Sequence, residues 1–345
     1  MQGILQAMAH RSPPQPSELQ QLATAELADI SRSKAFNITP ETVEDIIIAR
    51  SQLFQSLLQK RVNLPDIPHR LELLWQLWLP QALQLSQAYQ ASAHPIIQGI
   101  LGGQGTGKTT LAQALTAILE HLGHRTVSLS IDDLYKTYAE REYLRQVDPR
   151  LIWRGPPGTH DVELGLQVLD QLRHPVAGEL VAIPRFDKSL WNGAGDRIES
   201  QMVTGIDIIL FEGWFVGCQP VDDEAFEAAP PPIVSQADKR FAQDINSQLK
   251  NYIPLWQRLD RLIVLNPIDY RLSKQWRKQA EQEMMATGKS GMTDIEIEQF
   301  VDYFWKSLHP ELFISPLIEN LKVTDLVIDI NADHSVGNIY KPLLK

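Results

Sequence analysis

The chain has 345 residues, of which 43% are hydrophobic and 21% charged, and this globular composition excludes intrinsic disorder over most of its length. Its 32 basic and 42 acidic side chains leave a net charge of −10, so the basic footprint of a nucleic-acid-binding protein is missing. The single cysteine, Cys218, excludes an intramolecular disulfide, and we expect its thiol to be buried and inert. No run of 18 apolar residues occurs, so we expect a cytoplasmic protein without a membrane span.

Residues 1–94 are expected to form a helical region, although the first sixteen, rich in Pro, Ser and Gln, are expected to be mobile. Thr39 followed by Pro40 predicts a helix N-terminus, and an apolar stripe at helical spacing follows from Val43 to Leu58, interrupted by Arg50. A second helix, rich in Leu and Trp, is predicted over residues 71–85 with a kink at Pro80. An oligomerisation surface or a cap over a site are possible roles. We favour a helical subdomain packed on the rest of the chain.

Residues 95–345 alternate between predicted strands and helices. The candidate strands are Ile96–Leu101, Thr126–Ile131, Leu180–Pro184, Ile206–Phe211, Leu262–Leu265 and Leu326–Ile330. Their near-continuous Val, Ile and Leu content indicates strands buried on both faces, as in a parallel sheet. The alternation predicts an α/β fold with a doubly wound, mostly parallel sheet flanked by helices.

The first of these strands leads into a glycine-rich run that fits the pattern GxxxxGK[ST]. The run comprises Gly102, Gly103, Gln104, Gly105, Thr106, Gly107, Lys108 and Thr109, and Thr110 follows it. In this pattern backbone N–H groups surround a phosphate, the lysine reaches the β and γ oxygens, and the next hydroxyl contacts Mg²⁺. A helical pattern that begins at Leu111 supports the context. The sequence therefore predicts that this protein binds a nucleoside triphosphate.

Acidic residues follow two other predicted strands. Asp132 and Asp133 come after the second strand, and Glu212 follows the strand Ile206–Phe211 at a position like that of a Walker B carboxylate. Because the carboxyl ends of strands in a doubly wound sheet face the ligand crevice, we expect these side chains near the transferred phosphate. Either acidic site alone could consist of ordinary acidic residues in a turn at the end of a strand. Because both occur in a chain that also has a phosphate-binding run, we favour a role in the active site.

Two further segments combine rigid or permissive backbone with polar side chains. They are RGPPGTHD, from Arg154 to Asp161, and PRFDKS, from Pro184 to Ser189, which continues through Gly193 and Gly195 to Arg197. Both have the composition of loops that contact a small polar substrate, and surface turns are the alternative.

The motifs GGQGTGKTT, SIDDLY, RGPPGTHD, PRFDKSLWNGAGDR and FEGW, in this order and spacing, resemble D-glycerate 3-kinase of the plant and cyanobacterial type. That family belongs to a group of P-loop kinases with uridine kinase, phosphoribulokinase and pantothenate kinase. The resemblance covers about residues 95–335. It implies that Asp132 lies beside the acceptor hydroxyl as a base or orienting group, and that Thr109, Asp132 and Glu212 surround Mg²⁺.

The resemblance also implies a reaction, the ATP-dependent phosphorylation of D-glycerate at its 3-hydroxyl. The carboxylate of this hydroxy acid needs a cation, for which Arg185, Lys188 and Arg197 are the first candidates, with Arg154 and His160 behind them. The full set of expected substrate contacts is Asp133, Tyr135, Arg154, His160, Asp161, Arg185, Asp187, Lys188 and Arg197.

A lid is predicted over about residues 270–292. Arg271 and Arg277 lie there among several cations and are candidate catalytic residues, because arginines stabilise the charge that spreads over the phosphoryl oxygens. A solvated basic helix face paired with acids is the alternative. Thr293 and Glu296 predict a capping box that opens the next helix, with Phe304 in the core.

Other functions compete with this prediction. A nucleoside or pantothenate kinase would share the phosphate-binding run and the acids, and a non-enzymatic NTP-binding regulatory module would also use the run. A GTPase is disfavoured because Pro267 stands where the guanine-binding pattern NKxD has lysine.

Overall fold

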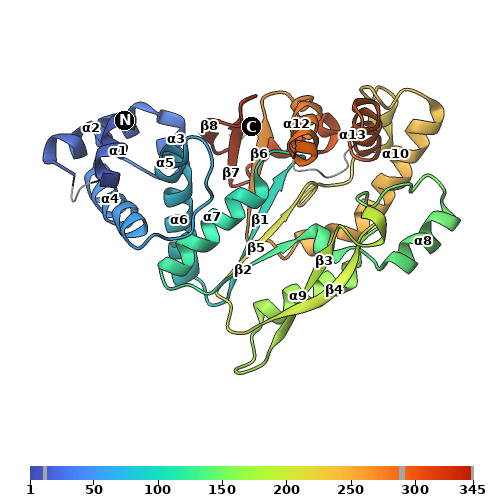
Figure 1. Cartoon of the computed structure of the whole chain (residues 1–345), viewed down its shortest axis with the longest axis horizontal. Coiled ribbons are helices and arrows are strands. Elements are labelled where there is room, and N and C mark those ends of the chain that lie inside the picture. The colour runs from blue at the N-terminus through green and yellow to red at the C-terminus, as the bar shows by residue number, and fades with distance from the viewer. Residues whose placement is uncertain (11–13, 287–291, 343–345) are drawn as a thin grey trace.

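The computed structural model describes residues 1–10, 14–286 and 292–342, and its centre is a six-stranded sheet (Figure 1). The strands are β1 (Ile96–Gly102), β2 (Thr126–Ser130), β5 (Ile208–Gly213), β6 (Arg261–Pro267), β7 (Leu326–Ile330) and β8 (Val336–Tyr340), in the order β2-β5-β1-β6-β7-β8. All neighbours are parallel except β7 and β8, and β8 was not predicted. The predicted α/β class with a mostly parallel sheet is confirmed, and β1 lies inside the sheet between β5 and β6.

The strand predicted over Leu180–Pro184 does not belong to this sheet. β3 (Val181–Asp187) instead pairs with β4 (Asp196–Val203) in a separate antiparallel hairpin (Figure 1). The prediction was wrong because Val and Ile content does not distinguish a strand buried on both faces from one with a single buried face. Ile183 is buried, whereas Ala182 beside it is exposed. The segment expected as a loop thus lies on two paired strands and the turn between them.

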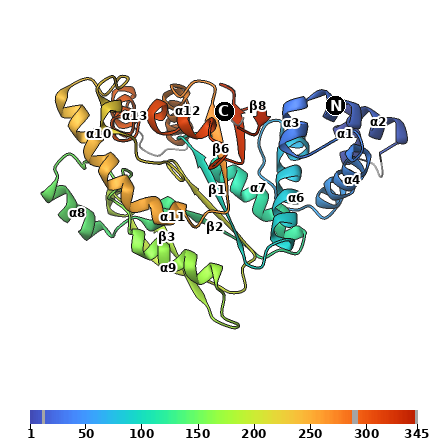
Figure 2. The same cartoon turned by 180° about the vertical axis from the view of Figure 1, so that it is seen from behind.

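Helices cover both faces of the sheet, which Figures 1 and 2 show from opposite sides. On one face α7 (Lys108–His121) shares a hydrophobic core with the N-terminal helices. The core of the other face includes residues of α9 (Val162–Arg173), α10 (Gln236–Leu249), α11 (Ile253–Trp256), α13 (Asp294–Ser307), α14 (Pro310–Phe313) and α15 (Ser315–Ile318). The capping box of Thr293 with Glu296 and the buried Phe304 are confirmed.

The N-terminal region is helical, as predicted. It comprises α1 (Gln2–His10), α2 (Pro16–Ala28), α3 (Ile30–Ala35), α4 (Val43–Gln59), α5 (Arg70–Leu73), the π-helical turn η1 (Leu74–Trp78) and α6 (Leu79–Gln90). Its core is continuous with that of the sheet, since Phe54 and Trp75 belong to the same buried cluster as Ile100 and Ile208. A domain boundary near residue 95 therefore stays a prediction.

Two local predictions in this region were wrong. Residues 2–10, expected to be mobile, form α1 and are packed on the core through the buried side chains of Leu5 and Met8. α4 begins at Val43 rather than at Pro40, because residues 40–42 form a turn. Pro80 lies in the first turn of α6, where its missing N–H costs little, directly after the π-helical turn, and the kink expected at this residue stays a prediction.

Arg50, the interruption of the apolar stripe, forms a buried ion pair. Its Nη1 lies 2.9 Å from Glu26 Oε2, and both side chains are only 1% exposed. The guanidinium stacks over the ring of Trp75 at 5.2 Å, and Arg32 approaches the other oxygen of Glu26 at 3.3 Å. Burial lowers the pKa of Arg50, and the charge of Glu26 opposes this shift. The pair joins α2, α4 and η1 at the position where Arg50 interrupts the apolar stripe.

We predict that Arg50→Met lowers the free energy of unfolding by about 3 kcal/mol, because removing one partner leaves the charge of Glu26 buried with weaker compensation. Urea denaturation followed by circular dichroism measures the change. Arg70→Met is the matched control, because Arg70 forms an exposed pair with Asp66 at 3.2 Å and should leave the unfolding midpoint unchanged. Equal midpoints for the two variants would contradict the prediction.

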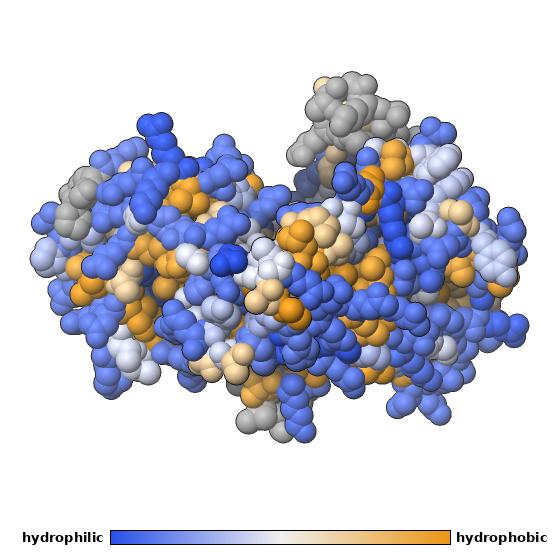
Figure 3. Space-filling view, turned by 90° about the horizontal axis from the view of Figure 1, so that it is seen from below, coloured by the Kyte–Doolittle hydropathy of each residue, from blue (hydrophilic) through white to orange (hydrophobic). Residues whose placement is uncertain are grey.

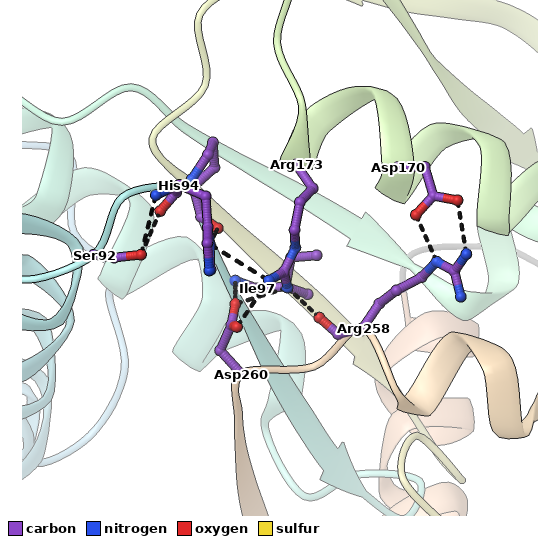
Figure 4. Close-up of polar contacts among 8 residues, drawn as sticks. Ser92, His94, Ile97, Asp170, Arg173, Arg258 and Asp260 are labelled. Atoms are coloured by element: carbon purple, nitrogen blue, oxygen red, sulfur yellow. Dashed lines mark hydrogen bonds and ion pairs between the residues drawn. The ribbon is translucent and has the colours of Figure 1, made fainter.

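The amino ends of the strands are held by a polar cluster (Figure 4). The Asp260 carboxylate accepts hydrogen bonds from the backbone N–H of Ile97 at 2.7 Å and from both terminal nitrogens of Arg173. Arg173 also donates to the carbonyl oxygen of Arg258, whose guanidinium is bonded to Asp170 at 2.7 Å. The cluster ties α9, β1 and the start of β6 together at the edge of the sheet opposite the glycine-rich run.

α3 lies beside the edge strand β8, and Lys341 Nζ donates to Asn37 Oδ1 at 3.0 Å. Seen from below, the molecule is mostly hydrophilic, with hydrophobic residues in separate groups (Figure 3). Within the described residues, no helix combines the length and apolar character needed to cross a bilayer.

Candidate active site

The glycine-rich run turns the chain from β1 into α7. Gly105 and Gly107 have φ angles of 77° and 86°, which residues with a side chain rarely adopt. Gly107 is the N-cap of α7, so the free N–H groups and the positive end of the helix dipole face the turn. Lys108 Nζ donates to the carbonyl oxygen of Gly103 at 2.9 Å. The backbone thus has the shape of a cradle for phosphate.

Glu212, at the end of β5, faces the first turn of α7. Its Oε1 accepts a hydrogen bond from Thr109 Oγ1 at 3.4 Å. Burial raises the pKa of Glu212, the carboxylate of Asp132 adds to the rise, and the charge of Lys108 opposes it. Burial lowers the pKa of Lys108, whereas Glu212 and Asp132 oppose that shift. The ammonium of Lys108 and the carboxylates of Glu212 and Asp132 therefore lie close together beside the cradle.

Asp132 lies in the short 3₁₀ turn η2 (Ile131–Leu134) that follows β2. Its Oδ2 is 2.6 Å from Lys188 Nζ, and it also accepts a hydrogen bond from the Tyr135 hydroxyl. Burial alone would raise the pKa of Asp132, but the charge and hydrogen bond of Lys188 and the hydrogen bond of Tyr135 outweigh it and hold the pKa below its ordinary value. Asp132 is thus an ionised carboxylate at neutral pH, with a quarter of its side chain exposed.

A cavity of about 1340 Å³ opens at the carboxyl ends of β1, β2 and β5. Its floor holds Gln104, Gly105, Lys108, Thr109, Ser130, Asp132, Tyr135 and Glu212, and its walls hold Tyr138, Arg141, Arg145, Trp153, Arg154, Lys188, Gly193, Ala194, Trp214, Arg277 and Phe304. The position agrees with the rule that ligands of doubly wound sheets bind at the carboxyl ends of the strands.

Four of the residues predicted to contact substrate form ion pairs outside this cavity. Asp133 Oδ2 is 2.9 Å from Arg185 Nη1, and Asp161 Oδ2 is 3.0 Å from Arg197 Nη2. Asp161 also caps α9 through the N–H of Leu164. None of the four lines the cavity, so their placement at the substrate is not supported. The two pairs hold the β3–β4 hairpin against η2 and the start of α9.

Two more predicted contacts lie behind the cavity wall or beside it. His160 is buried, its Nδ1 is 2.8 Å from the Tyr252 hydroxyl, and its ring stacks on that of Tyr135 at 4.5 Å. Burial lowers the pKa of His160 to about 3, so the ring is neutral and supports Tyr135 from behind. Asp187 accepts hydrogen bonds from Ser189 and shapes the hairpin turn. Among the predicted contacts, Tyr135, Arg154 and Lys188 line the cavity.

The predicted lid begins with α12 (Leu272–Ala286), and residues 287–291 lie outside the described part of the chain. Trp276 lies directly on the glycine-rich run: a Cβ at Gly105 would be only 2.7 Å from its Cβ. Arg277 lines the cavity, where it pairs with Glu281 and stacks on Phe300. α12 therefore covers the phosphate-binding turn.

Arg271 does not face this cavity. It pairs with Asp269 at 3.3 Å and lines a second cavity of about 460 Å³, in which Gln104 and Cys218 also take part. Its side chain is 64% exposed, so its assignment as a catalytic residue lacks support from the structure. Cys218 is buried, and burial raises the pKa of its thiol, in agreement with the expected inert group.

Arg141 was missed by the sequence analysis. It lies on α8 (Tyr138–Val147), whose residues match no phosphate- or substrate-binding pattern, and its spacing from SIDDLY carries no signal of its own. Only the fold brings α8 over the cavity.

Similar proteins support one family. No protein-family model matches the chain. It is 34% identical over 230 residues to the uncharacterized kinase mug58 of Schizosaccharomyces pombe, a match that covers 64% of this chain and 82% of that protein. It is 32% identical over 231 residues to the chloroplastic D-glycerate 3-kinase of Arabidopsis thaliana, covering 64% of this chain. The chain belongs to a family of kinases that includes mug58, and it is similar to proteins named D-glycerate 3-kinase.

A solved structure supports the same family. D-glycerate 3-kinase from Cryptococcus neoformans matches with a TM-score of 0.67 and 28% identity, covering 75% of this chain and 96% of that one. The chain spans about half the length of its Arabidopsis relative, 49%. The resemblance of the motifs to the D-glycerate 3-kinase family is thereby confirmed.

Proposed function

We propose that the protein is a kinase that transfers the γ-phosphoryl group of ATP to the 3-hydroxyl of D-glycerate, giving 3-phosphoglycerate and ADP. The observation that carries the proposal is the ionised carboxylate of Asp132, which faces the same cavity as Lys108 of the phosphate-binding turn. The names of its relatives favour glycerate as the acceptor.

In the proposed reaction the 3-hydroxyl oxygen bonds to the γ-phosphorus while the bond from this phosphorus to the β–γ bridging oxygen breaks. Asp132 accepts or orients the hydroxyl proton. Its ion pair with Lys188 must first break so that the carboxylate oxygen can contact the hydroxyl. Lys108 and the N-terminus of α7 bind the phosphates, and Arg277 stabilises their charge. Because the transition state of phosphoryl transfer is loose, positioning and electrostatics supply most of the rate.

The residues beside the turn fit Mg²⁺. This ion prefers a few oxygen ligands and keeps several waters, and the Thr109 hydroxyl with the carboxylates of Asp132 and Glu212 offers such a set. Glu212 accepts a hydrogen bond from Thr109 and lies with Asp132 in the lining of one cavity, and a divalent cation there would relieve the repulsion between the two carboxylates. These three residues would hold the ion. When bound, it neutralises charge on the β and γ phosphates.

We predict that ADP release from ATP depends on D-glycerate. A coupled assay compares D-glycerate with L-glycerate, uridine and pantothenate, since aromatic side chains such as Trp153 and Phe304 also line the cavity. We expect the highest kcat/KM with D-glycerate and little hydrolysis without an acceptor. Acceptor-independent hydrolysis would instead support a regulatory module, and faster turnover of uridine or pantothenate would support the other kinase classes.

A further inference from the structure

Two arginines in the cavity wall lack an acidic partner. Arg141 on α8 and Arg154 in the following loop both line the cavity, and neither forms an ion pair with a carboxylate within the described residues. We propose that Arg141 and Arg154 together bind the carboxylate of the acceptor. The proposal deepens the proposed function and rests on it.

Both guanidinium groups are held by backbone carbonyl oxygens of one turn in the β3–β4 hairpin. Arg154 Nη1 donates to Gly193 at 2.6 Å and to Ala194 at 3.0 Å. Arg141 donates to Ala194 at 2.6 Å, to Gly195, and through Nε to Lys136 at 2.9 Å. Carbonyl dipoles fix the two cations in place but do not neutralise them, so the turn supports two positive charges side by side.

Donors remain on both side chains. A guanidinium has five N–H groups, of which Arg141 uses three and Arg154 two in these bonds. Nε and Nη2 of Arg154 make no hydrogen bond with a described residue, and this pair of nitrogens forms an edge that suits a bidentate carboxylate. An anion placed here would find both charge and directed donors.

The two guanidiniums are close to one another. Both stack on the ring of Phe186, Arg141 at 5.2 Å and Arg154 at 5.6 Å from its centre. Burial lowers the pKa of Arg141, and the like charge of Arg154 lowers it further, although Asp196 opposes the shift. Asp196 already accepts hydrogen bonds from the backbone of Tyr138 and from the indole of Trp191, so its carboxylate is engaged elsewhere.

The pair is also close to the reacting end of the cavity. Arg154 lies over the ring of Tyr135 at 5.9 Å, and the hydroxyl of this tyrosine donates to Asp132. The ring of Tyr135 therefore lies between the guanidinium of Arg154 and the carboxylate of Asp132, which accepts the proton of the substrate hydroxyl in the proposed reaction. A three-carbon acid, with its carboxylate and its terminal hydroxyl at opposite ends, matches this arrangement.

The other cations first considered for this role are engaged. Arg185 and Arg197 pair with Asp133 and Asp161 outside the cavity. Lys188 lies 2.6 Å from Asp132, so its ammonium is placed at the end of the cavity where the hydroxyl reacts and not at the carboxylate end. Arg145 lines the cavity but pairs with Glu142.

The turn itself depends on a glycine. Gly195 has a φ of 72°, and a Cβ there would lie 2.3 Å from the ring of Phe186. The same residue thus allows the carbonyls to point at the arginines and lets Phe186 lie beneath them. This gives a physical reason for the motif GAGDR.

The test compares D-glycerate with its uncharged amide, 2,3-dihydroxypropanamide. Wild-type protein should favour the acid, and Arg141→Gln and Arg154→Gln should each lower the acid-to-amide ratio of kcat/KM about 10- to 100-fold, as expected for loss of a charge-assisted hydrogen bond. Arg141→Lys, which keeps the charge, should restore part of the ratio. A merely structural role would lower turnover of both substrates equally and leave the ratio unchanged.

Arg145→Gln is the matched control, because it removes a paired arginine from the same cavity and helix. Its ratio should equal that of wild type. An unchanged ratio in Arg141→Gln and Arg154→Gln, or an equal fall in Arg145→Gln, would overturn the carboxylate site while leaving the kinase proposal intact. Failure of the wild-type protein to phosphorylate D-glycerate would overturn the proposed function and the site with it.

Discussion

Asp132→Asn is expected to reduce kcat about 10²- to 10⁴-fold, because it removes the carboxylate that accepts the proton of the substrate 3-hydroxyl. The variant should still bind ATP, since the phosphate-binding turn and Lys108 are unchanged. Steady-state kinetics gives kcat, and equilibrium titration with ATP gives the dissociation constant.

Asp133→Asn is the matched comparison for this prediction. Asp133 neighbours Asp132 in the chain but forms an ion pair with Arg185 outside the cavity. Its substitution should lower thermal stability and reduce kcat much less than Asp132→Asn does. A kcat of Asp132→Asn close to that of wild type would contradict the role of Asp132 in the mechanism. A larger loss of kcat in Asp133→Asn than in Asp132→Asn would indicate that Asp133 is the base.

Lys108→Met is expected to lower kcat/KM for ATP about 10²- to 10³-fold, because the phosphates lose the positive charge that the P-loop lysine directs at them. Loss of this ammonium also leaves Glu212 and Asp132 less compensated, since its charge opposes the rise in the pKa of Glu212. Initial rates at varied ATP concentration measure the effect. Lys306→Met, which breaks a surface pair with Asp238 at 2.7 Å, is the control and should keep wild-type rates. Wild-type kcat/KM in Lys108→Met would contradict the proposed phosphate site.

The phosphate-binding turn could be predicted from the sequence because its chemistry is local. Glycines with positive φ, a lysine and a hydroxyl must follow one another within eight residues, and Gly105, Lys108 and Thr109 do so. Asp132 and Glu212 could be predicted by one further rule, since the carboxyl ends of parallel strands meet at one edge of the sheet.

The positions of several arginines relative to the cavity could not be predicted from local patterns. Arg185 and Arg197 lie in the motif PRFDKSLWNGAGDR, yet their side chains pair with Asp133 and Asp161, partners 52 and 36 positions away in the chain. Arg141 belongs to no motif and reaches the cavity because α8 crosses above it. Ion pairs between residues that are distant in the chain depend on the tertiary fold. A sequence motif does not show which partner each charged side chain has.

The N-terminal region shows the same limit for packing. A stripe of apolar residues predicted α4, but Arg50 was taken as an interruption because its partner, Glu26, lies 24 positions earlier on another helix. Similarly, the π-helical turn that directly precedes Pro80 could not be predicted from the apolar pattern.

The position of α3 beside β8 has a consequence for the behaviour of shortened forms of the protein. β8 is an edge strand, and an exposed edge offers unpaired N–H and C=O groups to strands of other molecules. α3 covers the neighbourhood of this edge, and Lys341 anchors the chain after β8 to Asn37. A fragment that begins at residue 95 would present β8 uncovered and so invite strand addition and aggregation. The N-terminal helices thereby protect the solubility of the sheet that follows them in the chain.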